Sequence, residues 1–368
     1  MKLRAHHQFL FGLLLTLFTA TGSLAAEPLT PGVWKNITPP AAQTSFADHI
    51  FCQGMTVDPQ NPRTIYVCIC AYDAAKGGLF KSNDSGGTWQ KCGDLDEPLH
   101  VAVNPRDSKH LYCVDGVRGK TLGFWTSRDG GDTWTMPEGF KKATEKPVGT
   151  RDLYSIAVDP TDFKHLLVSF HSPWAGKNCG VLESNDGGES WVAHDPPSTL
   201  KGGYGMAIFF LFDPAKKIGD RDTWLFTAQE GGFFKTTDGG KSWSNVYKFS
   251  MTHGGNQLYR AADGTLYSGG YQYPARSTDN GSSWEQIKTG LPYSWYMGII
   301  GDGERIYTAS TSKNQPFFVS SEKDGLKWQA LNEQKFSAVP FTMGFDPINK
   351  ILYSASWEEG LLALKLKD

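Results

Sequence analysis

The chain lacks several features that mark common classes of protein. Beyond the first 26 residues no run approaches 18 consecutive apolar residues, so no membrane-spanning helix is expected. Lys and Arg number 36 against 38 Asp and Glu, without a long basic run, and this balance argues against nucleic-acid binding. The sequence also has no Gly-x-Ser-x-Gly, no nucleotide-binding Walker loop and no His-Glu-x-x-His. The commonest serine-hydrolase, nucleotide and zinc-protease signatures are therefore absent.

The first 26 residues have the pattern of a secretory leader. Lys2 and Arg4 give a basic start, residues 9–18 are almost wholly apolar, and residues 23–26 are small enough for cleavage. We therefore expect a signal peptide over 1–26 and a mature protein over 27–368, secreted or periplasmic. No cysteine lies at the expected cleavage point, so a lipid anchor is not indicated.

Only six cysteines are present, at positions that do not form a zinc-binding pattern: 52, 68, 70, 92, 113 and 179. An exported protein can form disulfides. A β-turn that pairs Asp58 with Thr64 would place Cys52 opposite Cys70 on neighbouring strands. The sequence therefore predicts a Cys52–Cys70 disulfide, provided that no bulge shifts the register.

What the chain has in abundance is glycine, at 41 residues, and a repeated motif. A segment of the form Ser-x-Asp-x-Gly-x-Thr/Ser-Trp, here called the box, recurs five times with a sixth, worn copy. The copies lie at 82–89, 127–134, 184–191, 236–243 and 277–284, and the worn one at 321–328, where Lys323 replaces the Asp. Such a period of about 40–50 residues is typical of repeat architectures.

These boxes resemble the Asp-box repeats of a β-propeller superfamily. That superfamily includes sialidases, xyloglucan-active glycoside hydrolases, the sortilin ectodomain and the photosystem II assembly factor type. The resemblance covers nearly the whole mature chain and implies a propeller fold without selecting one activity. The motif also has a purely structural explanation, because Asp and Ser side chains can bond turn amides while glycine permits positive φ. The box carboxylates are therefore poor catalytic candidates.

A second repeat gives the number of blades. An apolar strand followed by Asp-Pro, Asn-Pro or Asp-Gly occurs seven times, at 57–59, 103–105, 158–160, 212–214, 262–264, 301–303 and 345–347. Four strands per unit then predict an all-β, seven-bladed propeller of four-stranded antiparallel blades, as a single domain over 27–368. The last unit lacks a fourth strand, and residues 32–36 resemble one, so we expect this N-terminal strand to complete the last blade and close the ring.

The topology divides the loops between two faces. With strands named A to D from the axis outward, the A–B turns and the boxes share one face, here the box face. The B–C loops and the connections between blades share the other, here the loop face. Ligands of the enzymes that the chain resembles bind away from the boxes, so the repeat-equivalent His110 and His165 are not expected to be functional.

A binding surface is therefore expected on the loop face, around the mouth of the central channel. Aromatic residues without a role in the repeat suggest such a surface. The candidate ligand-binding residues are Arg151, Trp174, His253, Tyr271, Trp295 and Trp357. The alternative is that the aromatics only pack loops onto the ring and that Arg151 pairs with Asp152 in solvent.

Catalysis is the second hypothesis. Candidates for catalytic groups on this face are Asp48, Asp152, His171 and Glu230. Two carboxylates at suitable spacing would support glycoside hydrolysis, and His171, His253 and Tyr271 would suit a polysaccharide lyase. The absence of Arg-Ile-Pro argues against a sialidase, and His49, His100 and His253 form only a weak metal pattern.

The sequence thus predicts an exported, monomeric propeller that recognises a protein or a glycan. It needs no cofactor or metal, and neither nucleic acid nor stable membrane insertion is expected. The alternative is a carbohydrate-active enzyme with its site at the mouth of the channel.

Overall fold

The structure is a computed structural model that describes most of residues 28–367. The described ranges are 28–42, 44–45, 48–71, 75–117, 119–175, 179–198, 200, 205–211, 221–229, 231–249, 257–337 and 340–367. The predicted signal peptide and two candidate residues, Glu230 and His253, lie outside them. Within these ranges no helix is long and apolar enough to cross a membrane.

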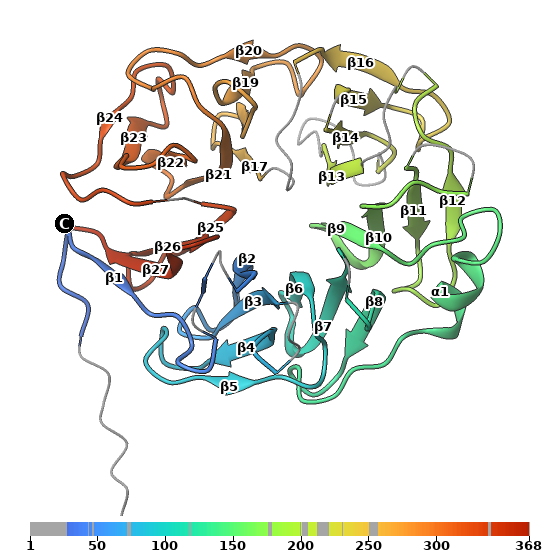
Figure 1. Ribbon diagram of the computed structural model, residues 1–368. Helices are drawn as coiled ribbons and strands as arrows, with labels where there is room; N and C mark the ends of the chain where they lie inside the picture. Colours follow the sequence, from blue (N-terminus) through green and yellow to red (C-terminus); the bar gives the residue numbers. More distant parts are fainter. Residues whose placement is uncertain are drawn as a thin grey trace, which may run out of the picture.

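The described strands form seven antiparallel sheets arranged as blades around a central axis (Figure 1). Blade 1 has β2 (Ile50–Val57), β3 (Ile65–Ala71), β4 (Gly78–Ser82) and β5 (Gln90–Lys91); blade 2 has β6 (Pro98–Asn104), β7 (Asp107–Asp115) and β8 (Gly123–Ser127). Blade 3 has β9 (Leu153–Asp159), β10 (Asp162–Phe170), β11 (Val181–Ser184) and β12 (Val192–His194). Blade 4 has β13 (Gly205–Phe210), β14 (Trp224–Ala228), β15 (Gly232–Thr236) and β16 (Ser244–Tyr247).

The remaining blades follow the same order. Blade 5 has β17 (Leu258–Arg260), β18 (Leu266–Ser268), β19 (Ala275–Ser277) and β20 (Glu285–Gln286). Blade 6 has β21 (Tyr296–Gly301), β22 (Arg305–Ser310), β23 (Phe317–Ser321) and β24 (Gln329–Ala330). Blade 7 has β25 (Thr342–Asp346), β26 (Ile351–Ser356) and β27 (Gly360–Lys365), with β1 (Trp34–Asn36) as its outer strand. The predicted seven-bladed propeller is confirmed.

Blade 2 departs from the pattern because its sheet has three described strands. In place of a fourth, Thr126 and Thr135 form a single antiparallel bridge. The chain then turns at Pro137 into the short helix α1 (Glu138–Ala143), whose Phe140 packs against Phe124 and Trp191. The helix thus covers the gap between blades 2 and 3.

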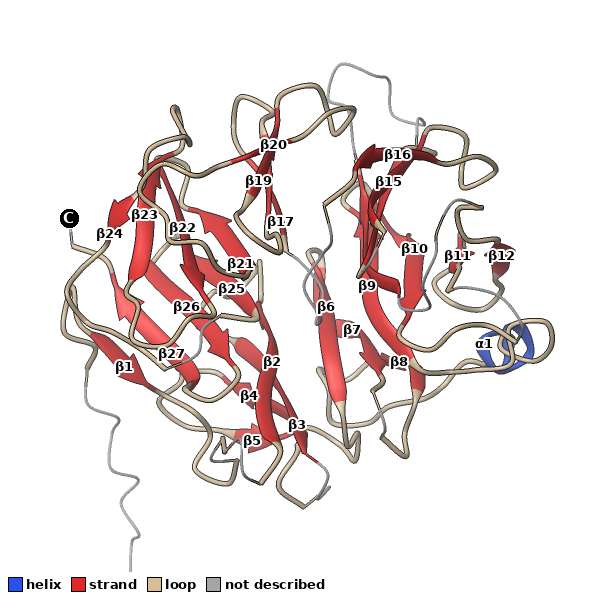
Figure 2. Ribbon diagram, turned by 45° about the horizontal axis from the view of Figure 1, so that its top comes forward, coloured by secondary structure: helices blue, strands red, loops and turns tan. Residues whose placement is uncertain are grey.

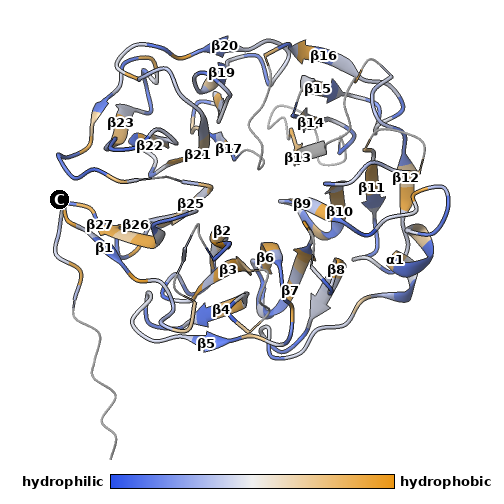
Figure 3. Ribbon diagram, viewed as in Figure 1, coloured by the Kyte–Doolittle hydropathy of each residue, from blue (hydrophilic) through white to orange (hydrophobic). Residues whose placement is uncertain are grey.

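The core of the protein consists of the contacts between neighbouring blades. Seven apolar clusters of described residues each join a blade to the next, and one of them joins blade 7 to blade 1. Strands such as β3, β14 and β26 are buried along their whole length. Hydrophobic residues gather on strands such as β7 and β27 (Figure 3), and the loops lie at the ends of the blades (Figure 2). Loop residues are therefore the ones left for ligands.

The boxes have the structural role expected for them. In the first box, Ser82 Oγ accepts a hydrogen bond from the Gly86 amide at 2.8 Å. Asp84 accepts from the Thr88 amide and from its hydroxyl, each at 2.8 Å. Equivalent bonds occur at Asp129, Asp186, Asp238 and Asp279. Hydrogen bonds from Thr133 lower the pKa of Asp129 to about 2, which marks it as a turn-stabilising carboxylate.

The predicted disulfide is wrong. A bulge between Cys52 and Gly54 shifts the register, so Cys52 lies opposite Ile69 and Cys70 lies opposite Phe51. Cys52 and Cys70 therefore form no disulfide with each other, and all six cysteines are buried. Burial raises the pKa of the Cys52 thiol, which makes it an unreactive core side chain.

The first described strand, β1, pairs with the last strand of blade 7. β1 pairs with β27 through Trp34–Leu364, Lys35–Ala363 and Asn36–Leu362. Trp34 is 4% exposed and stacks on Phe317 of blade 6 at 4.1 Å between ring centroids. The observed pairing is the one expected for residues 32–36.

Deleting residues 27–36 tests whether this pairing holds the ring together. Removal of β1 exposes the edge of β27 and opens the Trp34 contact, so the melting temperature should fall by several degrees and aggregation should increase. Val33 is 49% exposed in the same segment, and Val33→Ser serves as the control with an unchanged melting temperature. A deletion variant that melts like the wild type would contradict ring closure by β1.

A second prediction concerns the box tryptophans. Trp191 packs on Phe124 and Phe140, and its Nε1 donates to the Gly188 carbonyl at 2.9 Å. Trp191→Ala should lower the free energy of unfolding by about 3 kcal/mol. Chemical denaturation measures this loss of stability. The control is Val192→Ala, because Val192 is the next residue and is 56% exposed. Equal stability of Trp191→Ala and the wild type would show that the box is not structural.

Candidate functional site

The loop face carries a hydrogen-bonded carboxylate at the entrance to blade 3. Asp152 lies directly before β9 and is 8% exposed. Its Oδ2 accepts from His171 Nδ1 at 2.9 Å and from the Ser172 hydroxyl, and its Oδ1 accepts from the Val117 amide at 2.6 Å. Burial alone would raise the pKa of Asp152, but these hydrogen bonds hold it below its usual value. The structure therefore brings together two of the predicted catalytic residues, Asp152 and His171.

A second acidic group lies in blade 2 and was not predicted. Asp115 ends β7 and is fully buried. Thr121 Oγ1 lies 2.6 Å from Asp96 Oδ1 and 2.8 Å from Asp115 Oδ2. Gly119 closes over the pair, where a Cβ would come within 2.6 Å of Asp96 Oδ1. The sequence offers one sign of Asp115, which is its place in the repeat. It ends β7 with a carboxylate, whereas the corresponding strands β3 and β14 end in alanine.

The Asp115 carboxyl group loses its proton at a much higher pH than an ordinary aspartate. Burial raises its pKa to about 7, the hydrogen bond with Thr121 opposes this change, and the charge of Asp96 adds to it. A threonine hydroxyl has one proton to donate. Thr121 can therefore donate to only one of the two carboxyl groups at a time, so Asp96 and Asp115 compete for its proton. The other oxygen of Asp115, Oδ1, has no hydrogen-bond partner among the described residues.

The other conspicuous feature of the loop face is a group of four aromatic rings, here called the platform: Tyr271, Tyr273, Tyr293 and Trp295. Tyr271 and Trp295 lie 5.3 Å apart between centroids with a tilt of 36°. Tyr273 and Tyr293 meet edge to face at 5.8 Å. Trp295 is 40% exposed and Tyr293 is 65% exposed. The platform thus offers a broad apolar surface to solvent.

Backbone hydrogen bonds hold the platform in place. Tyr271 and Tyr273 belong to the B–C loop of blade 5, whereas Tyr293 and Trp295 belong to the connection into blade 6. Gly270 and Tyr296 exchange two backbone bonds, at 2.8 and 2.9 Å, and the Ser294 amide donates to the Gln272 carbonyl at 3.1 Å. These bonds join the two segments on either side of the rings, so the platform is preorganised for a ligand.

Several predicted ligand-binding residues lie elsewhere. Trp174 is 2% exposed and packs edge to face on Phe170. It therefore packs a loop onto the blade and is not available to a ligand. Trp357 stacks on Phe341 and also contacts Phe51. Arg151 is exposed, and its Nε donates to Thr144 Oγ1 at 3.1 Å.

Two further predicted groups do not form a site with Asp152 in the described structure. Asp48 is exposed, and its amide donates to Ser45 Oγ at 3.2 Å. Burial lowers the pKa of His100 to about 4, so that imidazole is neutral. Among the described residues no group of three His, Cys, Asp or Glu side chains is arranged to hold a metal.

Comparison with known proteins adds carbohydrate-active relatives. No family model matches the chain. The oligoxyloglucan-reducing end-specific xyloglucanase of Emericella nidulans is 26% identical over 248 residues, covering 59% of this chain and 29% of that protein. The xyloglucanase of Hypocrea jecorina is 25% identical over 295 residues, covering 73% of this chain and 30% of that protein. The chain therefore spans less than a third of these curated relatives.

Solved structures share the fold. A crystal structure of an ancestral GH74 enzyme superposes with a TM-score of 0.59 at 16% identity, covering 89% of this chain and 45% of that one. YCF48 bound to D1 peptide superposes with a TM-score of 0.61 at 14% identity, covering 94% and 99%. At these identities the likeness establishes the propeller fold.

The raised pKa of Asp115 predicts a pH dependence of stability. Between pH 4 and 7 the folded state keeps a proton that the unfolded chain has lost, so stability falls as pH rises through this window. Where the folded state is fully protonated and the unfolded state fully ionised at this group, the free energy of unfolding falls by about 1.4 kcal/mol for each pH unit. In Asp115→Asn the free energy of unfolding should lose this slope between pH 5 and 7.

Asp94 is exposed and lies near Asp96 in sequence, so Asp94→Asn is the matched control and should keep the wild-type slope. Denaturant titrations at pH 5, 6, 7 and 8 make the comparison. Parallel pH profiles for Asp115→Asn and the wild type would contradict a protonated Asp115.

Proposed function

We propose that this protein is a carbohydrate-binding propeller that holds an oligosaccharide against the platform on its loop face. The observation that carries the proposal is the exposed, backbone-fixed pair of Tyr271 and Trp295, extended by Tyr273 and Tyr293. Aromatic faces present large rigid apolar areas, and the C–H faces of pyranose rings pack well on them.

Polar groups around the rings suit a sugar. Gln272 Oε1 accepts from the Gln286 side chain at 3.4 Å, and the hydroxyls of Ser294 and Ser312 lie 2.7 Å apart. Lys288 Nζ lies 5.7 Å from the Tyr273 centroid. Amide, hydroxyl and ammonium groups of this kind can bond sugar hydroxyls while the aromatic rings supply contact area.

The sequence relatives support this choice of ligand class. Both sequence relatives reported above are named xyloglucanases. A polysaccharide ligand would match the exposed rings of the platform. The proposed exported location, through a cleaved leader over 1–26, would place the protein where such polysaccharides occur.

The second candidate function is glycoside hydrolysis near blades 2 and 3. The specific observation in its favour is the pair of Asp152 and His171, which lie 2.9 Å apart on the loop face with side chains 12% and 13% exposed. A carboxylate that orients a histidine is a common arrangement for acid–base catalysis. If the protein hydrolyses xyloglucan, Asp152→Asn should abolish release of reducing ends.

Calorimetric titration with a xyloglucan heptasaccharide and with cellopentaose tests the binding proposal. We expect 1:1 binding that Trp295→Ala weakens about 10-fold or more, because loss of a stacked aromatic anchor costs about 2 kcal/mol. Phe249 is an exposed aromatic of the loop face outside the platform, and Phe249→Ala should bind like the wild type.

Three results would count against the proposal: no heat with either sugar, equal affinity of Trp295→Ala and the wild type, or equal losses in Trp295→Ala and Phe249→Ala. A parallel reducing-end assay separates the two functions. Binding without release supports the binding propeller, and release that depends on Asp152 supports the hydrolase.

A further inference from the structure

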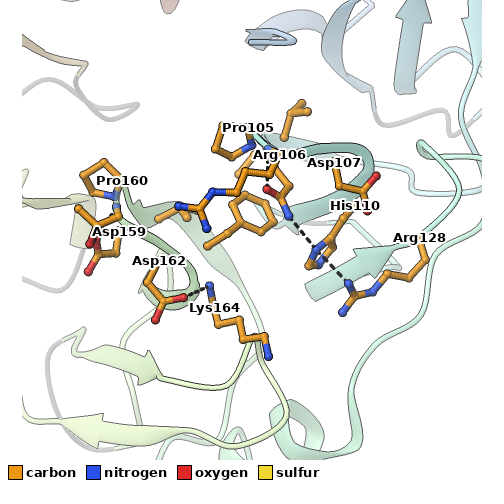
Figure 4. Close-up of a pocket in the computed structure, with 15 residues that line it drawn as sticks. Pro105, Arg106, Asp107, His110, Arg128, Asp159, Pro160, Asp162 and Lys164 are labelled. Carbon is orange, nitrogen blue, oxygen red and sulfur yellow. Dashed lines mark hydrogen bonds between the residues drawn. The ribbon is translucent and has the colours of Figure 1, made fainter. Parts of the chain in front are cut away.

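The box face has a pocket that the proposed function does not use. A cavity of about 540 Å³ opens between the A–B turns of blades 2 and 3 (Figure 4). One part of its wall is apolar, with Val103, Val158 and Phe163, and another carries charged side chains. A cavity of this size is in the range that accommodates a small organic molecule rather than a bare ion.

An arginine in this pocket is held by a neutral partner. Arg128 Nη1 donates to His110 Nδ1 at 2.9 Å, and Asn104 Nδ2 lies 3.3 Å from the same nitrogen. Since both neighbours are donors, Nδ1 must be the acceptor and the imidazole is neutral. Burial and the charge of Arg128 both lower the pKa of His110, to about 4. His110 therefore orients the guanidinium and leaves its positive charge uncompensated.

The charged side chains in the wall of the pocket differ in whether they have an ion-pair partner. Two lining carboxylates are engaged by Arg221, whose Nη1 lies 3.5 Å from Asp159 and 2.8 Å from Asp162. Asp159 also accepts from His165 Nδ1 at 3.0 Å. By contrast, three lining cations form no ion pair with any described residue, namely Arg106, Arg128 and Lys164.

One lining carboxylate, Asp107, forms no ion pair with a described cation, and its Oδ1 accepts from the Lys109 amide at 3.1 Å. The pocket therefore holds three unengaged cations against one such carboxylate. In Figure 4 the Arg106 side chain reaches from one turn towards Pro160, while Arg128 approaches His110 from the other side. Positive charge thus lies on two sides of the cavity.

We propose that this pocket binds a small organic carboxylate of about monosaccharide size, such as a sugar acid. The planar fork of Arg128 matches a carboxylate, and Arg106 or Lys164 adds a second positive contact. Phe163 is fixed by stacking on Tyr112 at 4.6 Å and supplies an apolar wall for the carbon skeleton. The inference rests on the box face alone and does not depend on the platform.

Calorimetric titration with D-glucuronate at low salt tests it, with D-glucose and inorganic sulfate as the comparison probes. We expect 1:1 binding of glucuronate, with glucose and sulfate each at least about 10-fold weaker, because neither combines a carboxylate with a carbon skeleton. Arg128→Gln should lose about 10-fold or more. Arg63 lies on the A–B turn of blade 1 and is exposed, so Arg63→Gln is the matched control.

His110 is a positioning residue, and two substitutions separate this role from general stability. His110→Gln retains an acceptor for Arg128 and should keep most of the affinity, whereas His110→Leu removes it and should bind like Arg128→Gln. Melting curves establish which variants are folded. If Arg128→Gln is unfolded, Arg106→Gln and Lys164→Gln decide instead, each with an expected loss of several-fold.

The proposal is overturned if glucuronate does not bind the wild type, if glucose binds equally well, or if sulfate binds more tightly than glucuronate. It is also overturned if the folded arginine and lysine variants all keep wild-type affinity.

Discussion

Burial of both faces of every blade against its neighbours is the constraint on which this structure depends. Seven apolar clusters join successive blades, and the last one brings blade 7 against blade 1. Strands such as β3 and β26 are buried throughout and have no side chain to offer a ligand. Chemistry is therefore confined to the loops at the two ends of the blades, where side chains from successive blades meet.

The two ends differ in character. The loop face has exposed aromatics on blades 5 and 6 and buried carboxylates on blades 2 and 3. The box face has turn-stabilising aspartates and, between blades 2 and 3, cations without carboxylate partners. This division matches the two proposed ligands, a neutral glycan at one end and a small acid at the other. The same repeat produces both ends, because each blade contributes a B–C loop to one and an A–B turn to the other.

Much of this fold could be predicted from the sequence because the repeat is explicit. The box spacing and the seven A–B turns predicted the blade number, and within the predicted segment 32–36 the structure pairs Trp34–Asn36 with the last blade. The disulfide could not be predicted, since one bulged residue between Cys52 and Gly54 shifts the whole register. The missing fourth strand of blade 2 follows from Pro137 and α1, which direct the chain away from the sheet edge.

Less of the candidate site was predictable. The sequence singled out Tyr271 and Trp295, but their contact depends on backbone bonds between two loops of neighbouring blades. Tyr273 and Tyr293 were missed, although the density of aromatics over 271–296 was a usable signal. Trp174 was expected at the surface and is buried, because periodicity does not reveal which way a loop folds back.

Hydrogen–deuterium exchange with and without a xyloglucan heptasaccharide tests the central claim most directly. The account predicts slower exchange in residues 269–274 and 288–296, which carry the platform, with no change in residues 104–107 on the box face. Protection confined to the box face, or equal protection on both faces, would contradict it.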